Sequence, residues 1–186
     1  MIYLLDSYPQ ANGLNACSIE EKKLFLRNHH CYVEASKRSQ RAITDADIII
    51  YSAGTQHSSL FPTYLSQGIS RNIIENKDAL KVFISNIGAD YETPFYKAHD
   101  YLNAALRYLN FAEKTSYDHS QFFDIALINY SESFNEKNHV RVDKSELDKI
   151  NCLISLNNYE KSNSGKHNGE LILEEIMDIY LRKLRQ

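Results

Sequence analysis

Residues 45–68 read DADIIIYSAGTQHSSLFPTYLSQG, and the expected architecture follows from this stretch. Its isoleucine-rich run, 47–51, is short and uninterrupted, which favours a strand buried on both faces of a parallel sheet. Ser58 or Ser59 is expected to cap a helix after it. Pro62 falls in the first turn of that helix, where a missing N–H costs little. We therefore interpret the stretch as a strand, a loop and a helix.

The loop within this stretch combines small residues with hydrogen-bonding side chains. Residues 52–54 allow a tight turn at Gly54, and the next five carry hydroxyl, amide or imidazole groups: Thr55, Gln56, His57, Ser58 and Ser59. In an open α/β sheet, a loop between the carboxyl end of a strand and the amino end of a helix binds anions through backbone N–H groups. A phosphate-bearing ligand is therefore expected at residues 54–59. The alternative is a well-capped turn without a ligand, because one glycine makes neither a Walker loop nor a dinucleotide fingerprint.

Strands and helices are expected to alternate along the rest of the chain. The expected strands are residues 2–5, 81–87, 122–129 and 152–156, with a short extended piece at 139–143. The expected helices are residues 18–27, 36–44, 60–65 and 69–76, with two more that begin near 93 and 168. Strands separated by helices of this length predict right-handed parallel crossovers. The expected fold class is therefore α/β, a three-layer, Rossmann-like, mostly parallel sheet with helices on both faces.

Two of the expected helices have an apolar face at helical spacing. The first is expected to open at Thr93-Pro94, and its buried face is Ala98, Tyr101, Leu102, Ala105, Leu106 and Leu109. The closing helix is expected to bury Leu173, Ile176, Met177, Tyr180 and Leu184. Both faces are interpreted as hydrophobic core.

Length and composition exclude several classes of protein. A chain of 186 residues suits one domain, 1–186, with a real core. Its 21 basic and 24 acidic side chains form no block of one sign, which argues against nucleic-acid and membrane-surface binding. Cys17, Cys31 and Cys152 lack C-x-x-C spacing, so neither a disulfide framework nor a thiolate metal site is indicated. The chain has no signal-peptide pattern and no apolar run near the roughly 20 residues that span a bilayer, so a cytoplasmic location is expected.

The loop sequence has a counterpart in a known family. SAGTQHSSLFP contains Gly54, the hydroxyl of Thr55, the pair Ser58 and Ser59, and Pro62. This order resembles the 2-phospho-L-lactate transferase (CofD) family and its gluconeogenesis-factor branch (YvcK-like, UPF0052). In that family a strand leads to a Gly-Pro-Gly-Ser loop, a Thr-Ser pair, a proline and a short helix. Ser-Ala replaces the first glycine and the proline here, and Gln-His replaces a Leu-Tyr pair.

Later segments extend the resemblance. KVFISNIGADYETP is similar to the family's strand that ends in Asn-Ile and its loop that closes on Glu-Thr, matched here by Asn86-Ile87 and Glu92-Thr93. His167 lies where the family has a histidine before its last helix. Family members open with a strand and a Gly-Gly-Gly-Thr-Gly loop, which nothing in residues 1–44 matches. The chain is therefore expected to be the carboxyl-terminal portion of a longer protein, or a half-protein completed by a partner, either a second copy or the missing amino-terminal half.

Polar residues after the second expected strand add to the candidate site. Asn86 is expected at the same sheet edge as the loop, where it either bridges ligand hydroxyls or amides, or caps a turn. Asp90 and Glu92 follow it and either hold a divalent ion that bridges phosphates or are solvated, since hard cations prefer carboxylates. His57 is a candidate donor to a phosphate oxygen, and no catalytic residue is assigned.

The resemblance implies two functions of different class. One is transfer of a phospholactyl-type group from a nucleotide-linked donor to an acceptor hydroxyl, a reaction run mainly by positioning and electrostatics. The other is a non-catalytic regulatory module that binds a sugar nucleotide. A third interpretation is a fragment with an incomplete site. The expected ligand is a small phosphorylated molecule, either a nucleotide diphosphate or a sugar nucleotide, with Mg²⁺ as the candidate cofactor.

Overall fold

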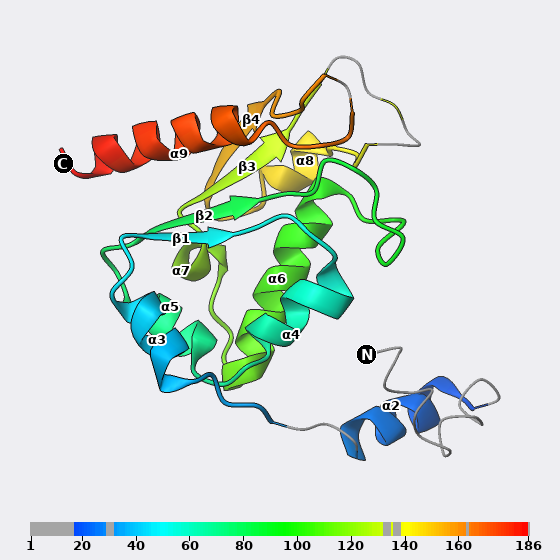
Figure 1. Ribbon diagram of the computed structural model, residues 1–186. Helices are drawn as coiled ribbons and strands as arrows, with labels where there is room; N and C mark the ends of the chain where they lie inside the picture. The colour runs from blue at the N-terminus through cyan, green and yellow to red at the C-terminus, as the bar shows by residue number, and fades with distance from the viewer. Residues whose placement is uncertain (1–16, 29–31, 132–134, 136–138, 163, 186) are drawn as a thin grey trace. The chain divides into compact units, whose positions relative to one another are not determined.

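The computed structural model describes residues 17–28, 32–131, 135, 139–162 and 164–185 (Figure 1). The chain divides into two compact units, residues 1–34 and 35–186. The first unit contains helix α2, Ile19–Asn28, which confirms the expected helix there. A capping box begins it, since the Ser18 N–H donates to the Glu21 carboxylate at 2.7 Å and the Glu21 N–H donates to Ser18 Oγ at 3.3 Å. The expected strand at residues 2–5 and Cys31 lie outside the described residues, and a single domain over 1–186 stays a prediction.

The second unit contains a four-stranded parallel sheet in the order β1-β2-β3-β4. Its strands are β1, Ile48–Tyr51; β2, Leu80–Ile84; β3, Ile125–Asn129; and β4, Leu153–Asn157. This confirms the expected α/β class and all four expected strands of this unit. Strand β3 starts later than expected, because Phe122 ends helix α7, His119–Phe122, and the chain turns there before it enters the sheet. In the described residues 139–143 the extended piece does not join the sheet.

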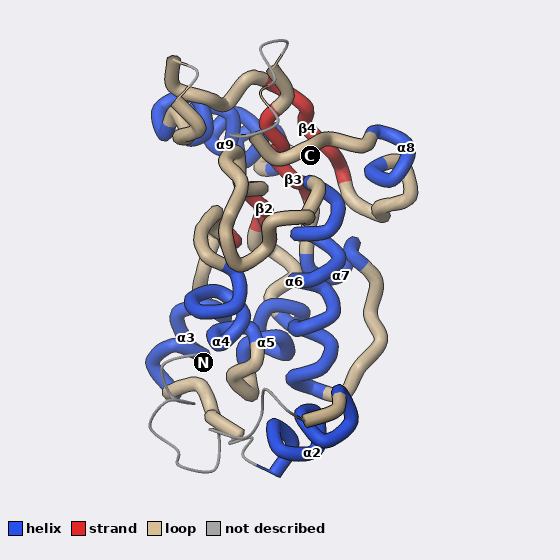
Figure 2. Tube along the Cα trace, turned by 90° about the vertical axis from the view of Figure 1, so that its right-hand side faces the viewer, coloured by secondary structure: helices blue, strands red, loops and turns tan. Residues whose placement is uncertain are grey.

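The helices cover the two faces of the sheet unequally, as Figure 2 shows. One face carries most of the helices and the larger core cluster, in which Tyr51, Phe83 and Ala126 from the strands pack with Tyr101 and Leu102 from a helix. Besides α7, the helices of this unit that precede β4 are α3, Lys37–Thr44; α4, Phe61–Tyr64; α5, Ile69–Glu75; α6, Ala98–Glu113; and α8, Lys144–Leu147. The opposite face carries α9, Gly169–Lys183. No helix in the described part of the chain is long and apolar enough to cross a membrane.

Helix α6 confirms the expected buried face but not the expected start. Thr93 is not helical, since its N–H donates to the Asp90 carbonyl at 3.0 Å and its hydroxyl lies 3.0 Å from Tyr101 Oη. The helix begins after Lys97, whose N–H donates to the Asp100 carboxylate at 2.8 Å. Pro94 therefore sits in a surface turn that leads into the helix. The buried face is Ala98, Tyr101, Leu102, Ala104, Ala105, Leu109 and Ala112, with Leu106 half-buried.

On the face of the sheet that carries α9, two sets of side chains are less buried than the sequence predicted. Ile50 of β1 is 47% exposed, so burial of this strand on both faces was wrong. The physical reason is that β1 is an edge strand of the sheet that the described residues form, and the core on this side is built mainly on β2 and β3. On α9, Ile176 is buried as expected, whereas Leu173 is 57% and Leu184 64% exposed. The expected stripe is therefore only partly covered.

Gly68, which precedes α5, provides a test of this fold. Its φ of +90° is in the left-handed region, and a Cβ there would meet the Gln40 side-chain amide at 3.2 Å. That amide is held by its own hydrogen bond to the Ala35 carbonyl at 2.7 Å. Gly68→Ala is therefore expected to lower the free energy of unfolding by about 1–2 kcal/mol, the usual cost of a left-handed backbone for an L-residue.

Urea unfolding measures this loss. Gly169→Ala is the matched control, because Gly169 is the first residue of α9 and a Cβ there meets no atom within 4 Å. The control is expected to keep or slightly raise the wild-type midpoint, because Ala favours a helix more than Gly does. Equal midpoints for the two variants would contradict the strain assigned to Gly68.

Candidate functional site

The candidate loop and Asn86 meet at the carboxyl edge of the sheet. The loop follows β1, Asn86 follows β2, and the two strands pair in parallel with Tyr51 opposite Phe83. The Gly54 N–H donates to Asn86 Oδ1 at 3.0 Å, and Asn86 Nδ2 donates to the Gly54 carbonyl at 3.1 Å. Both ends of the Asn86 amide therefore hold the loop, which places Gly54 and Asn86 together as expected.

Gln56 closes the loop from inside. Its side chain is 2% exposed, and its Nε2 donates to the Gly54 carbonyl at 2.8 Å. This carbonyl therefore accepts from two side-chain amides. The chain then enters a π-helical turn, Gln56–Leu60, which continues into α4. Gln56 is thus a structural residue of the loop in this conformation.

Glu92 holds the amino end of that turn. Its Oε2 accepts from the His57 N–H at 2.9 Å and from the Ser58 N–H at 3.1 Å. Hydrogen bonds from the Ser58 hydroxyl and then from these two N–H groups lower the pKa of Glu92, although partial burial opposes the shift. The residue before the turn, Thr55, makes no side-chain capping bond, and Ser58 and Ser59 lie inside the turn. Capping by either serine was therefore wrong, because a carboxylate from another loop takes that role.

The other side chains of the loop make local contacts. The Thr55 and Ser59 hydroxyl oxygens lie 2.8 Å apart. The His57 ring packs edge-on against Phe61 with centroids 5.0 Å apart, and against Tyr108 at 6.4 Å. Of the expected ligand-binding residues, His57 and Ser58 thus present backbone N–H groups to one carboxylate oxygen, whereas the Gly54 N–H donates to Asn86. The side chains of Thr55, His57 and Ser59 stabilise the loop itself.

Asp90 and Glu92 lie in one short turn and are the expected metal ligands. Asp90 Oδ1 accepts from the Glu92 N–H at 3.0 Å, whereas Asp90 Oδ2 is buried without a hydrogen-bond partner. That buried oxygen fits a cation, but Glu92 Oε2 already faces two N–H groups. Within the described ranges no group of three or more His, Cys, Asp or Glu side chains is arranged to hold a metal ion. Magnesium at Asp90 and Glu92 therefore stays a prediction.

The thiol of Cys152 is not a reactive group. Cys152 forms no disulfide. Burial raises the pKa of Cys152 to about 12, with a smaller contribution from Asp124. A thiol with this pKa stays protonated near neutral pH and is a poor nucleophile.

His167 reaches the same sheet edge from the segment before α9. Its Nε2 lies 2.9 Å from the Ser85 carbonyl, one residue before Asn86. Because a carbonyl only accepts, Nε2 carries the proton in the neutral ring and Nδ1 is an acceptor. Burial lowers the pKa of His167, and the hydrogen bond to Ser85 opposes the shift. Sequence reasoning matched this histidine to the family but found no contact for it, since its partner lies 82 residues away.

A second polar cluster lies at the end of β3 and was missed by sequence reasoning. His139 Nε2 lies 3.0 Å from Glu160 Oε1, and the two side chains are 6% and 0% exposed. His139 also lines a cavity of about 420 Å³ with Asn129, Tyr130, Ser131, Val140, Arg141 and Val142. The only sequence signal was a histidine in an otherwise polar segment. A buried acidic partner for it follows only from the fold.

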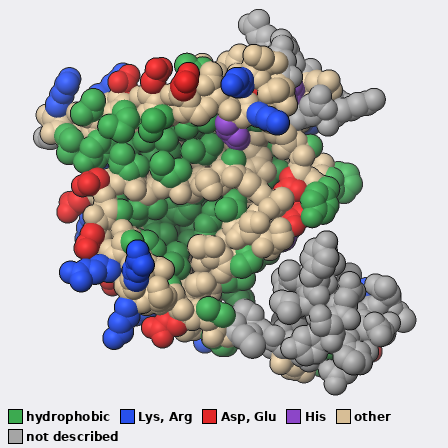
Figure 3. Space-filling model, viewed as in Figure 1, with side chains coloured by type: hydrophobic (Ala, Val, Ile, Leu, Met, Phe, Trp, Pro, Cys, Tyr) green, Lys and Arg blue, Asp and Glu red, His purple; other side chains and the backbone are tan. Residues whose placement is uncertain are grey.

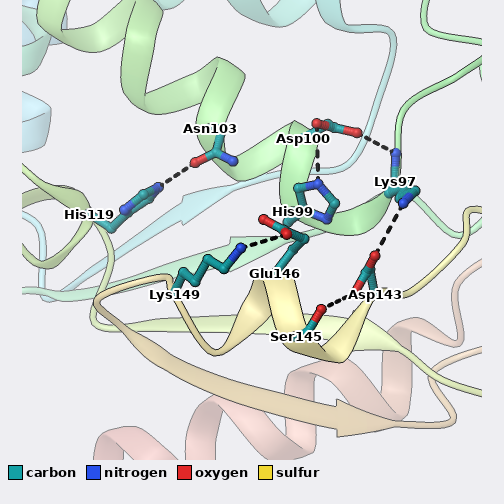
Figure 4. A network of polar contacts seen from close by, with 9 residues as sticks. All are labelled: Lys97, His99, Asp100, Asn103, His119, Asp143, Ser145, Glu146 and Lys149. Carbon is teal, nitrogen blue, oxygen red and sulfur yellow. Dashed lines mark hydrogen bonds and ion pairs between the residues drawn. The ribbon is translucent and has the colours of Figure 1, made fainter.

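A third cluster is structural. Figure 4 shows it between the start of α6 and α8. Lys97 Nζ lies 3.1 Å from Asp143 Oδ2, and Ser145 Oγ donates to Asp143 Oδ1 at 2.8 Å. The Ser145 hydroxyl, and then Lys97, lower the pKa of Asp143 to about 2. The carboxylate is therefore charged over the physiological range and ties the two helices together.

Fold and site together define a parallel α/β protein with two backbone N–H groups directed at the Glu92 carboxylate at the carboxyl edge of its sheet. The model of the family described as 2-phospho-L-lactate transferase CofD matches residues 10–159. The chain belongs to this family, which confirms the resemblance seen in the sequence.

Individual relatives agree with this assignment. A putative gluconeogenesis factor from Clostridium acetobutylicum is 28% identical over 173 residues, which cover 84% of this chain and 36% of the relative. Two crystal structures of one Bacillus halodurans protein, described as a member of the UPF0052 family, align with TM-scores of 0.65 and 0.64 at 22% and 23% identity. They cover 77% of this chain and 47% and 46% of theirs. The chain therefore spans less than half the length of these relatives.

The lowered pKa of His167 predicts a pH effect on stability. Because the folded-state pKa is depressed below about 6.5, the unfolded chain binds the proton first as the pH falls. The contribution of His167 is therefore present above about pH 6.5 and is lost as the pH falls through the folded-state pKa. His167→Gln keeps a side-chain N–H donor for the Ser85 carbonyl and does not titrate. The variant is expected to lose less unfolding free energy than wild type between about pH 7.5 and about pH 5.

Denaturant unfolding at a series of pH values tests this. Burial also lowers the pKa of His119, and the charge of Asp118 opposes this shift. Because His119 is present in both proteins, its contribution cancels when the two pH profiles are compared. Parallel pH profiles for wild type and His167→Gln would show that His167 is not buried as described.

Proposed function

We propose that this CofD-family chain binds the phosphate groups of a nucleotide diphosphate or sugar nucleotide at residues 54–59. The observation that supports this is the convergence of the His57 and Ser58 N–H groups on one anionic oxygen, Glu92 Oε2, at 2.9 and 3.1 Å. Adjacent N–H groups at the start of a helical turn form an anion site. The Glu92 carboxylate therefore stands in for an oxygen of the ligand phosphate.

A phosphate can replace Glu92 without disturbing the core. Glu92 lies in a surface turn whose neighbours Tyr91 and Phe95 are 82% and 91% exposed. The N–H groups that it would release stay in place, since the loop is held independently by Asn86 and Gln56. Because a diphosphate carries more charge than a carboxylate, it competes well for these donors. Displaced Glu92, together with the unpartnered oxygen of Asp90, then becomes available to Mg²⁺.

Transfer of a phospholactyl-type group is the second candidate function, and the family match supports it. Such a reaction depends on positioning and charge stabilisation, to which the His57 and Ser58 N–H groups, and Mg²⁺ if it were held by Asp90 and Glu92, would contribute. A regulatory module that only binds a sugar nucleotide agrees with the gluconeogenesis-factor name of the Clostridium acetobutylicum relative. An assay with the purified chain and a nucleotide-linked donor that it binds separates these two functions. Product formation would indicate a transferase, and binding without product would indicate a regulatory module. In either case we propose that the protein acts in the cytoplasm.

Thermal unfolding with a panel of nucleotide diphosphates and sugar nucleotides, with and without Mg²⁺, tests binding. A ligand that binds only the folded state raises the melting temperature, equivalent to about 2.7 kcal/mol at a hundredfold excess over Kd. Gly54→Val is expected to abolish this rise by placing a branched side chain in the loop. The variant should still fold, because a Cβ at Gly54 comes no closer than 3.8 Å to Leu60. An unchanged rise in Gly54→Val would refute the loop as the binding site.

Removal of the competing carboxylate gives a second test. Glu92→Ala frees the N–H groups of His57 and Ser58, so pyrophosphate is expected to bind about five- to tenfold more tightly. This factor corresponds to the roughly 1 kcal/mol that is no longer needed to break the hydrogen bonds between these N–H groups and Glu92. Isothermal titration calorimetry in the absence of Mg²⁺ measures the change. Glu146→Ala is the matched control, since it removes a surface carboxylate paired with Lys149 at 2.6 Å. Weaker binding by Glu92→Ala would mean that Glu92 contacts the ligand instead of competing with it.

A further inference from the structure

Two asparagines near the end of the chain lie in hydrogen-bonded turns of the same kind. Asn158 Oδ1 accepts from the Glu160 N–H at 3.2 Å, and Asn168 Oδ1 accepts from the Glu170 N–H, also at 3.2 Å. In each turn the asparagine side chain accepts from the backbone two residues later. The two turns can therefore be compared at the residue that lies between acceptor and donor.

The backbone nitrogen that follows each asparagine has different surroundings. After Asn158, the Tyr159 N–H donates to Asn129 Oδ1 at 2.7 Å, and Tyr159 is 1% exposed. After Asn168, Gly169 is the first residue of α9, where an N–H has no partner within the helix. Among the described residues nothing else accepts a hydrogen bond from it. The Gly169 nitrogen is therefore open to reaction, whereas that of Tyr159 is not.

The start of α9 is also accessible. Gly169 and Glu170 are exposed, and a Cβ at Gly169 would meet no atom within 4 Å. Figure 3 shows acidic side chains gathered along the outer side of this helix, which lies at the surface. Glycine has no side chain to shield its own nitrogen, and it allows backbone rotations that other residues resist. Asn-Gly occurs at residues 12–13 and 168–169, of which the second pair lies within the described residues.

The side-chain carbonyl of Asn168 is polarised by the helix that it caps. Besides the Glu170 N–H, its Oδ1 accepts from the Leu171 N–H at 3.4 Å. These donors and the positive end of the helix dipole favour negative charge on Oδ1. Two backbone N–H groups directed at a carbonyl oxygen stabilise the charge that develops there when a nucleophile attacks the carbon. The Asn168 carboxamide carbon is therefore an activated electrophile beside the Gly169 nitrogen.

We propose that Asn168 is a site of spontaneous deamidation. The Gly169 nitrogen loses its proton to the solvent and forms a bond with Asn168 Cγ. The bond between Cγ and Nδ2 breaks, and Nδ2 takes up a proton and leaves as ammonia, which closes a succinimide ring. Water then opens the ring. Attack of water at Cγ gives aspartate, whereas attack at the main-chain carbonyl carbon gives isoaspartate, in which the chain continues through Cβ and Cγ.

The two products affect the fold differently. Aspartate keeps an oxygen that caps α9 and adds negative charge at the positive end of the helix, so it preserves the fold. Isoaspartate lengthens the main chain between α9 and the anchors before it. These anchors are the Asn168 N–H, which donates to the Tyr159 carbonyl at 2.7 Å, and His167 Nε2, which lies 2.9 Å from the Ser85 carbonyl. Isoaspartate is therefore expected to loosen this segment at the sheet edge that carries the candidate site.

The test incubates the full 186-residue chain at mildly alkaline pH, below its unfolding temperature, and follows each asparagine by peptide mapping with mass spectrometry. Asn168 is expected to gain the mass that replacement of an amide by a carboxyl group adds. Because an exposed helix start opens at little cost, its rate should lie within about tenfold of that in a synthetic peptide of residues 165–172. Asn158 is the matched internal control and is expected to stay unconverted.

Gly169→Ala tests the nucleophile. The variant should keep the fold, because the added Cβ meets no atom within 4 Å, and its conversion is expected to be slower by about tenfold or more. Chromatography of the mapped peptides separates aspartate from isoaspartate, with Asn168→Asp as the reference for the first product. Protein enriched in isoaspartate is expected to have a lower urea midpoint than Asn168→Asp.

Four outcomes contradict the proposal. The site is refuted if Asn168 of the folded chain stays unconverted, or if Asn158 converts as fast as Asn168 does. The assigned nucleophile is refuted if Gly169→Ala converts at the wild-type rate, and the effect on the fold is refuted by equal urea midpoints. The reaction involves no ligand, so its outcome is independent of the phosphate site proposed at residues 54–59.

Discussion

The parallel pairing of β1 with β2 places the two halves of the candidate site together. Its register, from Ile48 opposite Leu80 to Tyr51 opposite Phe83, brings the carboxyl ends of both strands to one sheet edge. Gly54 and Asn86, 32 residues apart, can therefore exchange two hydrogen bonds. An antiparallel pairing would send the two loops to opposite edges of the sheet. The loop, its hydrogen-bond donors and the turn that contains Glu92 all depend on this register.

The same loop is organised by side chains of the protein itself. A helical turn leaves its first N–H groups without partners, and a buried or half-buried donor without a partner costs free energy. Glu92 removes that cost at His57 and Ser58, while Asn86 and Gln56 hold Gly54 from the other side. A site kept in its binding conformation loses less entropy when it binds. In the proposed binding mode the cost is competition, because a phosphate would have to displace the Glu92 carboxylate.

The two faces of the sheet explain why the molecule has one complete core and one partial core. Several helices close the face that contains Tyr51 and Phe83. The other face has α9, which covers two central strands and leaves Ile50 47% exposed.

Local sequence patterns were enough to predict the α/β class, the four strands and the helix starts after Ser36 and Asn168, because periodicity and capping act over a few residues. They also indicated Gly54 and Asn86 as neighbours, since parallel strands end at one edge. Tertiary structure alone placed the Glu92 carboxylate, 34 and 35 residues from its partners, at the helical turn where a serine cap was expected. It also placed Leu173 on the exposed side of α9. Periodicity shows that a helix has an apolar face, but only the neighbouring elements determine how much of that face is covered.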